Sequence, residues 1–245
     1  MQQWQKNVYV LWVAVLIASA TWSMVMPFMP VFLEKELGVT QGVSAWAGVL
    51  GAVNSLGMAL MSPVWGAMGD RYGRKMMMMR AGISLVVCYG LLSLVRGPYE
   101  LLGVRIMIGA LTGFIPTATA LVGTTTPQEH VGKALALVTT AGPTGTILGP
   151  LLGGLLWDLV GMRMSMASGS VALAIATLMV LLFVKEEFTP DRREQANLLA
   201  DMGEVLHYRG FAVLLVTTTL GMAAMGSMEP VMIPFIKTLV GESAP

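Results

Sequence analysis

The sequence predicts an all-α integral membrane protein, a bundle of about seven membrane-spanning helices. Of its 245 residues, 55% are hydrophobic and only 12% are charged, whereas soluble domains carry about 25% charged residues. Such an apolar chain has lipid as its main solvent, in which only helices and closed barrels satisfy the backbone hydrogen bonds. Barrel strands alternate polar and apolar residues, but the apolar runs of this chain are long and unbroken. The spans are therefore predicted to be helices.

Apolar stretches that are long enough to cross a bilayer define the individual spans. A hydrocarbon core of about 30 Å requires about 20 apolar residues. Seven stretches meet this length: Val8–Leu33, Ser44–Met68, Met76–Val95, Tyr99–Thr124, Lys133–Trp157, Met162–Val184 and Phe211–Ile236.

The first stretch has some features of a cleaved signal peptide. Lys6 precedes it, and Ala18-Ser19-Ala20 is similar to a small-residue cleavage site. The apolar run continues to Leu33, however, and its roughly 26 residues are too many for a cleaved leader. We therefore expect a permanent membrane anchor.

Basic residues near the span ends predict the orientation. Cytoplasmic loops of membrane proteins are enriched in Lys and Arg, so the end with more basic residues is expected inside the cell. Ten of them fall on the side of the N-terminus: Lys6, Arg71, Arg74, Lys75, Arg80, Lys133, Lys185, Arg192, Arg193 and Arg209. Four fall on the other side: Lys35, Arg96, Arg163 and Lys237. We expect a cell membrane (plasma or inner membrane) protein with a cytoplasmic N-terminus.

Composition also excludes several classes of function. A net charge of +1 leaves no basic surface for a nucleic acid. The only cysteine, Cys88, lies in an apolar run, and no His or Cys residues have metal-ligand spacing. We expect a protein that is not an enzyme, with no metal site, no cofactor and no nucleic-acid partner, embedded in a lipid bilayer.

The seventh span is similar to the first. With an offset of 203 residues, Pro27 aligns with Pro230 and Phe32 with Phe235. Either two proline-containing helices match by coincidence, or a second, parallel repeat begins here, as in some transporters. The repeat predicts three parts: a six-helix bundle over 1–184, a cytoplasmic linker over 185–210, and the first helix of a second bundle over 211–245. The expected partner of the first bundle is then the missing C-terminal half.

The loop between the second and third spans reads GAMGDRYGRK. We expect Gly73 to provide a turn with positive φ and Asp70 to cap the third span. An ordinary basic cytoplasmic loop would explain the positive charges alone. The complete spacing resembles the G-x-x-x-D-R-x-G-R-[RK] signature of the major facilitator superfamily, a family of secondary transporters. The matching residues are Gly66, Asp70, Arg71, Gly73, Arg74 and Lys75.

The fourth span contains a charge, Arg105. An arginine at the centre of a span costs about 2.5–3.5 kcal/mol on insertion scales. Gly109 and Gly113 follow at steps of four residues, so we expect Arg105 on a closely packed face. Snorkelling of the side chain to the outer surface is the alternative. The pattern is similar to the superfamily motif R-x-x-x-G-x-x-x-G, whose arginine faces the central cavity.

The fifth span contains GTILGPLLGG, in which glycines at spacing four suggest close helix packing and Pro150 suggests a bend. Small-residue packing alone is a common pattern. The full string resembles the antiporter motif of drug/proton exchangers in the superfamily; its residues are Gly145, Gly149, Pro150, Gly153 and Gly154. In the first span, Pro27 and Pro30 fit the P-x-x-P of the twelve-helix drug exporters. There Ala20-Thr21 replaces their usual Leu-Gly.

The seventh span contains a carboxylate, Glu229, directly before Pro230. Ionisable residues inside a span are candidate functional residues. Our hypothesis is that Glu229 carries protons and that Arg105 influences it, since the resemblance implies that the first, fourth and seventh spans line the cavity. The alternative is an interfacial glutamate that reaches the headgroup water.

Together, the motifs predict proton-coupled efflux of hydrophobic or cationic drugs by alternating access, with small hydrophobic substrates and protons as partners. Three alternatives stay open: uptake or exchange of a metabolite by the same fold, a seven-helix receptor, and an inactive, truncated half-transporter.

Overall fold

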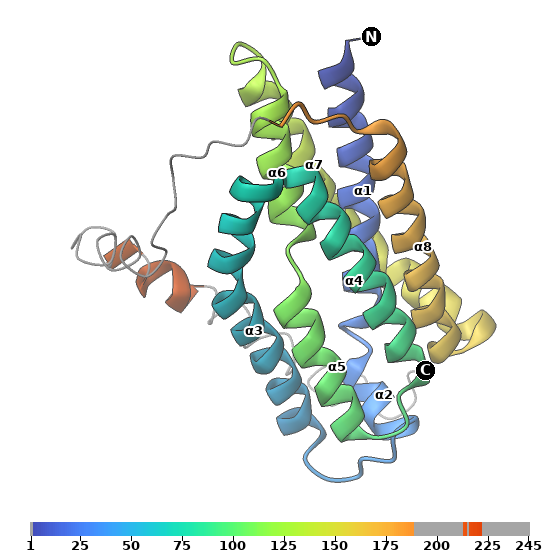
Figure 1. The fold of residues 1–245 in the computed structure, drawn as a ribbon. Helices are drawn as coiled ribbons and strands as arrows, with labels where there is room; N and C mark the ends of the chain where they lie inside the picture. The colour runs from blue at the N-terminus through green and yellow to red at the C-terminus, as the bar shows by residue number, and fades with distance from the viewer. Residues whose placement is uncertain (1, 189–212, 215, 222–245) are drawn as a thin grey trace.

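The computed structural model describes residues 2–188, 213–214 and 216–221 (Figure 1). Within these ranges the chain is helical and contains no strand. The helices are α1 (Gln3–Val25), α2 (Met29–Lys35), α3 (Val43–Tyr72), α4 (Arg74–Leu94), α5 (Pro98–Leu111), α6 (Phe114–Thr125), α7 (Val131–Val160) and α8 (Met162–Phe183). In the described part of the chain, six helical segments, with α5 and α6 taken together, are long and apolar enough to cross a membrane. The predicted all-α membrane fold is confirmed.

The first predicted span is two helices rather than one. α1 ends at Val25, and α2 begins at Met29 after a short turn. Pro27 lies in this turn, where its ring and missing N–H prevent a regular helix. Pro30 lies in the first turn of α2, a position that suits proline. The two prolines therefore redirect the chain at this end of the bundle.

The fourth predicted span is also interrupted. α5 ends at Leu111, α6 begins at Phe114, and Gly113 between them has a φ of 140°, which favours glycine. Near the break, the Trp65 indole N–H donates a hydrogen bond to the Ala110 carbonyl over 2.7 Å. That carbonyl lies in the last turn of α5, where helix carbonyls need outside partners. Gly113 is thus a helix break, and the prediction that it continues the packing face of Arg105 was wrong.

Most of the predicted seventh span lies outside the described residues. The parts that are described, 213–214 and 216–221, are helical. Glu229, Pro230 and the repeat lie outside, as does most of the predicted linker. The division into parts at residues 184 and 210 stays a prediction.

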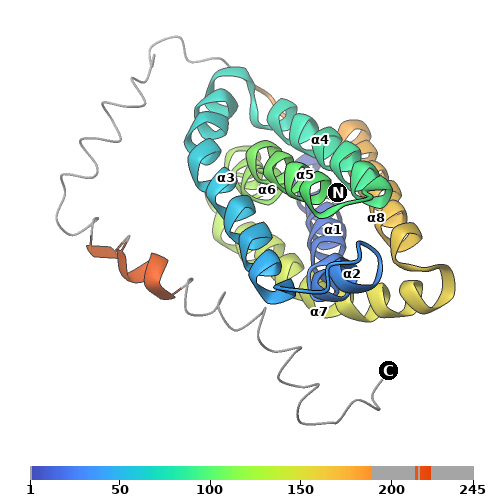
Figure 2. The ribbon, with the colours of Figure 1, turned by 90° about the horizontal axis from the view of Figure 1, so that it is seen from below.

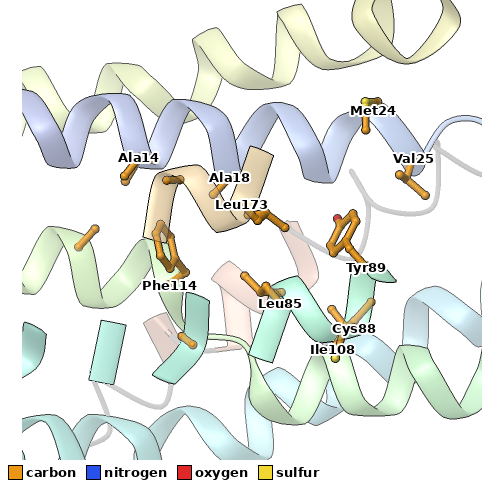
Figure 3. Close-up of a cluster of buried hydrophobic side chains, with 14 of the residues drawn as sticks. Ala14, Ala18, Met24, Val25, Leu85, Cys88, Tyr89, Ile108, Phe114 and Leu173 are labelled. Carbon is orange, nitrogen blue, oxygen red and sulfur yellow. The ribbon is translucent and has the colours of Figure 1, made fainter. Parts of the chain in front are cut away.

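α1 is the central helix of the bundle (Figure 2). Of its most apolar stretch 61% is buried, against 11% for α3. α1 packs most extensively against α7 and also against α8 and α6. In the core, Met24 and two alanines of α1 lie near Tyr89 of α4 and Leu173 of α8 (Figure 3). Exposed apolar side chains on α3, such as Leu56 and Leu60, are left for contact with lipid or another part of the protein.

The loops lie at the two ends of the bundle in the two groups that the basic residues predict. At one end, the Gln3 side chain donates a hydrogen bond to the Phe183 carbonyl (3.2 Å), and the Trp4 ring stacks on His130 with 5.0 Å between centroids. The start of α1, the α6–α7 loop and the end of α8 therefore share one end. At the opposite end, Arg163 pairs with Glu36 over 3.2 Å.

Candidate functional site

The α3–α4 connection is a single residue, Gly73. Its φ of 94° and ψ of 143° confirm the predicted turn with positive φ. A Cβ atom at this position would lie 3.1 Å from Glu186 Oε2 and 3.3 Å from a carbon of the Phe188 ring. Glycine is therefore required here both for its backbone conformation and for the close approach of the segment after α8.

Asp70 and Arg74, on either side of this turn, form a salt bridge of 3.0 Å. The other terminal nitrogen of Arg74 donates a hydrogen bond to the Ala120 carbonyl, also over 3.0 Å. Arg74 thus connects the end of α3 to α6. The prediction that Asp70 caps the third span was wrong, because its carboxylate lies in the last turn of α3 and binds the guanidinium of Arg74 instead.

Glu186 caps the third span. Its carboxylate accepts hydrogen bonds from the backbone N–H groups of Arg74 (3.0 Å) and Lys75 (2.8 Å). A negative charge at this position also interacts favourably with the helix dipole. The Lys75 ammonium in turn donates to the Leu181 carbonyl over 3.0 Å. The motif loop is therefore fastened to the end of α8. The sequence did not predict a role for Glu186, because its position directly after the sixth span is the only feature that distinguishes it.

Gly66 and Arg71, the other motif residues, face more open surroundings. Nothing lies within 4 Å of a Cβ built on Gly66. Arg71 is exposed and lies over the ring of its neighbour Tyr72, 5.3 Å from the centroid. Gly66 lines a cavity of about 250 Å³ between α3 and the α5–α6 pair; its polar lining side chains are Ser62, Asp70, Arg74, Thr112 and Thr117.

Arg80 packs beside the same break in the fourth span. Its guanidinium carbon lies 3.6 Å from the centroid of the Trp65 ring, a cation–π contact. Two of its nitrogens, Nε and Nη1, are buried without a hydrogen-bond partner among the described residues. The position of Arg80 predicts only that it helps to set the membrane orientation. In the structure it also contributes to the packing of α3 against α4.

Arg105 lies inside the bundle. Its side chain is only 2% exposed, so it does not snorkel to the surface. Its neighbour Gly109 permits close packing as predicted, since a Cβ there would lie 3.0 Å from the Asn54 Cα of α3. The guanidinium carbon lies 5.8 Å from the centroid of the Trp22 ring. Its Nε has no hydrogen-bond partner in the described part of the chain.

No carboxylate pairs with Arg105 among the described residues, whose ion pairs are Asp70–Arg74 and Glu36–Arg163. Every acidic residue in the described ranges lies in a loop or near a helix end: Glu34, Glu36, Asp70, Glu100, Glu129, Asp158, Glu186 and Glu187. Among the described residues, the positive charge of Arg105 is therefore buried without a negative charge that compensates it. Glu229, the predicted partner, lies outside the described residues.

Three of the four glycines of the fifth-span motif face α1 at very close range. A Cβ on Gly149 would lie 2.5 Å from the Ala20 carbonyl oxygen and 2.9 Å from the Met24 nitrogen. Gly145 and Gly153 would meet the α1 backbone at 2.6 and 2.5 Å. We call this contact the glycine seam: Gly145, Gly149 and Gly153 against residues 16–24 of α1.

The other two motif residues lie outside the seam. A Cβ on Gly154 would be in ordinary contact with the Phe28 ring, at 3.7 Å. Pro150 lies within α7, which runs unbroken from Val131 to Val160. The motif therefore mainly allows the backbones of α1 and α7 to approach each other closely.

The described residues also contain no group of acidic, His or Cys side chains that could hold a metal ion.

Comparison with known families decides the identity of this arrangement. The sequence model described as Major Facilitator Superfamily matches residues 11–244. The chain belongs to the Major Facilitator Superfamily. It is a multi-pass membrane protein of this transporter family and not an enzyme.

Among superfamily members, the chain is similar to proteins named multidrug resistance protein MdtG. It is 33% identical to that of Serratia proteamaculans, covering 98% of this chain and 59% of the relative. It is 34% identical to that of Salmonella typhimurium, covering 98% and 60%. The chain thus spans about three fifths of the length of these relatives, and the predicted resemblance to drug exporters is confirmed.

Solved structures share the fold. The POT family transporter PepTSo superimposes with a TM-score of 0.69 at 14% identity, over 93% of this chain and 48% of that protein. About half of that transporter therefore corresponds to this chain in fold.

Proposed function

We propose that the complete protein exports hydrophobic small molecules, drugs among them, in exchange for protons by alternating access. The names of its relatives support the class of substrate. The glycine string of the fifth span supports exchange, because it resembles the motif of drug/proton antiporters. The second half of such a transporter is needed for the two halves to rock around a central site.

Buried Arg105 is the observation that carries this proposal. The Arg105 side chain is only 2% exposed, and its charge has no carboxylate partner among the described residues. Burial of an unpaired charge is costly, so an anionic group is expected to approach it in part of the transport cycle. Glu229 is our candidate for that group, on the basis of its position in the predicted seventh span.

The exchange then follows from charge balance. Ionised Glu229 pairs with Arg105, whereas protonated Glu229 is neutral and releases it. A substrate that favours one of these two states shifts the equilibrium between them, which links its movement to that of the proton. A neutral hydrophobic drug needs only the apolar surface of the cavity. A cationic drug needs a carboxylate as well, and Glu229 is the predicted one.

We further propose that the protein lies in the cell membrane with its N-terminus in the cytoplasm. The structure groups the start of α1, the α3–α4 turn and the end of α8 at one end of the bundle. Lys6, Arg74, Lys75 and Lys185 belong to these segments. The positive-inside rule makes this end cytoplasmic.

The proposal is tested with the complete reading frame in drug-sensitive bacteria. Accumulation of a fluorescent hydrophobic dye is measured with and without a protonophore. We expect lower accumulation in expressing cells and loss of this difference when the proton gradient is abolished. Higher accumulation on expression would instead indicate uptake, and would overturn the proposal.

Variants then test the assigned residues. Arg105→Gln and Glu229→Gln are expected to lower proton-driven efflux at least tenfold. Arg96→Gln, an exposed arginine in the loop before α5, is the matched control and should leave efflux unchanged. Full efflux by Arg105→Gln at equal expression would remove Arg105 from the mechanism.

A further inference from the structure

Residues 16–24 of α1 contact two superfamily motifs, those of the fourth and fifth spans. On one side, this segment forms the glycine seam with α7. Gly149 lies so close to it that a Cβ would overlap the Ser23 hydroxyl and the backbone of Ala20 and Met24. The Ser23 hydroxyl also donates a hydrogen bond to the Gly145 carbonyl over 3.2 Å. The separation between α1 and α7 is therefore set by the absence of side chains at the seam.

On another side, the same segment reaches Arg105 of α5. The centroid of the Trp22 ring lies 5.8 Å from the guanidinium carbon, within the limit of about 6 Å for a cation–π contact. No described carboxylate pairs with Arg105. The face of the Trp22 ring therefore offers its charge a cation–π partner, beside the nearby Tyr89 hydroxyl.

The segment is also in contact with α4 and α8. The Tyr89 hydroxyl of α4 donates a hydrogen bond to the Thr21 carbonyl over 3.4 Å. A Cβ on Gly169 of α8 would lie 2.8 Å from the Thr21 side chain. Figure 3 shows Tyr89 pointing toward α1 near Met24. With contacts on these sides and close packing throughout, a shift at the seam is transmitted along α1 rather than absorbed locally.

We propose that Trp22 is a positioning residue for Arg105, and that the glycine seam acts on Arg105 through Trp22. The seam fixes where α1 lies, α1 fixes the Trp22 ring, and the ring holds the guanidinium in the orientation that meets its anionic partner. This inference rests on the proposed function, in which Arg105 takes part in proton coupling. It connects two motifs that are 40 residues apart in the sequence (Arg105 and Gly145).

The test compares two activities of the complete protein in membrane vesicles: dye efflux driven by a pH gradient, and dye–dye exchange without a gradient. A residue that positions the coupling arginine affects the first and spares the second. Trp22→Leu is expected to lower proton-driven efflux three- to thirtyfold, the range that a cation–π contact supplies, and to leave exchange within about twofold. Arg105→Gln should show the same division. Trp12→Leu, on α1 but in contact with Thr140 of α7, is the control.

Two further variants keep the test decisive if Trp22→Leu folds poorly. A fluorinated tryptophan introduced at position 22 keeps the shape of the ring but weakens its electrostatic face, so it should reduce proton-driven efflux alone. Gly149→Ala should reduce efflux less in a Trp22→Leu background than in the wild type, because the path to Arg105 is already broken.

The outcomes separate the inference from the function. Normal efflux with fluorinated Trp22, parallel loss of both activities, or additive effects of Gly149→Ala and Trp22→Leu would overturn the positioning role while leaving the proposed function intact. Normal proton-driven efflux by Arg105→Gln would overturn the proposed role of Arg105 itself.

Discussion

Glu186 accepts a hydrogen bond from the backbone N–H of Arg74 over 3.0 Å, although the two residues are 112 positions apart in the chain. This contact joins the end of the sixth span to the start of the third. The Arg74 side chain meanwhile binds Asp70 and the Ala120 carbonyl. The signature loop is therefore held from α3, α6 and the segment after α8 at once, so any change in this segment reaches the loop directly.

Removal of the Glu186 carboxylate should loosen the loop. Glu186→Ala deprives two backbone N–H groups of their acceptor, and loss of such a helix cap costs about 0.5–2 kcal/mol. We expect a lower melting temperature of the complete protein in detergent, with a smaller decrease for Glu186→Gln. The exposed neighbour Glu187 is the control. An equal decrease for Glu187→Ala would argue that general negative charge, rather than capping, matters here.

Gly73 and Gly66 belong to the same motif but should respond differently to substitution. Gly73→Ala places a side chain at a φ of 94° and close to Glu186, and such strain costs about 1–3 kcal/mol. Gly66→Ala adds a methyl group to open space and should change the melting temperature little. Equal instability of both variants would contradict the open surroundings of Gly66.

Much of the fold could be predicted because each span must be apolar over about 20 residues whatever it packs against. The predicted Ser44–Met68 and Met162–Val184 correspond closely to α3 and α8. Hydropathy does not detect backbone breaks, however. The interruptions after Val25 and at Gly113 depend on proline and on a left-handed glycine, and both lie in apolar sequence.

The candidate site was predictable where a motif lies within one loop or helix. The turn at Gly73 and the close packing at Gly109 follow from neighbouring residues alone, whereas the sequence left open whether Arg105 is buried or snorkels. Glu186 and Trp22 could not be found in this way, because each acts on a residue far away in the chain. The glycine stripe of the fifth span likewise predicts close packing, but the sequence does not identify α1 as its partner.

Gly149 and Gly154 provide a contrast within one helix. Gly149→Ala forces a methyl group into the α1 backbone, and overpacking of this kind costs about 1–3 kcal/mol. Gly154→Ala makes an ordinary contact with the Phe28 ring and should be tolerated. We expect Gly149→Ala to reduce both the melting temperature and the yield of folded protein. Equal tolerance of the two substitutions would show that α1 and α7 are not held together as tightly as the structure indicates.

Cysteine labelling can determine which end of the bundle faces the cytoplasm. Cys88 is the only cysteine of the chain and is 1% exposed, so Cys88→Ala provides a background for single cysteines. Gln41 and Glu187 are exposed positions in the α2–α3 loop and after α8. With the basic end inside, a membrane-impermeant maleimide should label Gln41→Cys in intact cells, and Glu187→Cys only after permeabilisation. The reverse pattern would invert the proposed orientation. Labelling of both in intact cells would contradict the predicted six spans between the N-terminus and residue 187.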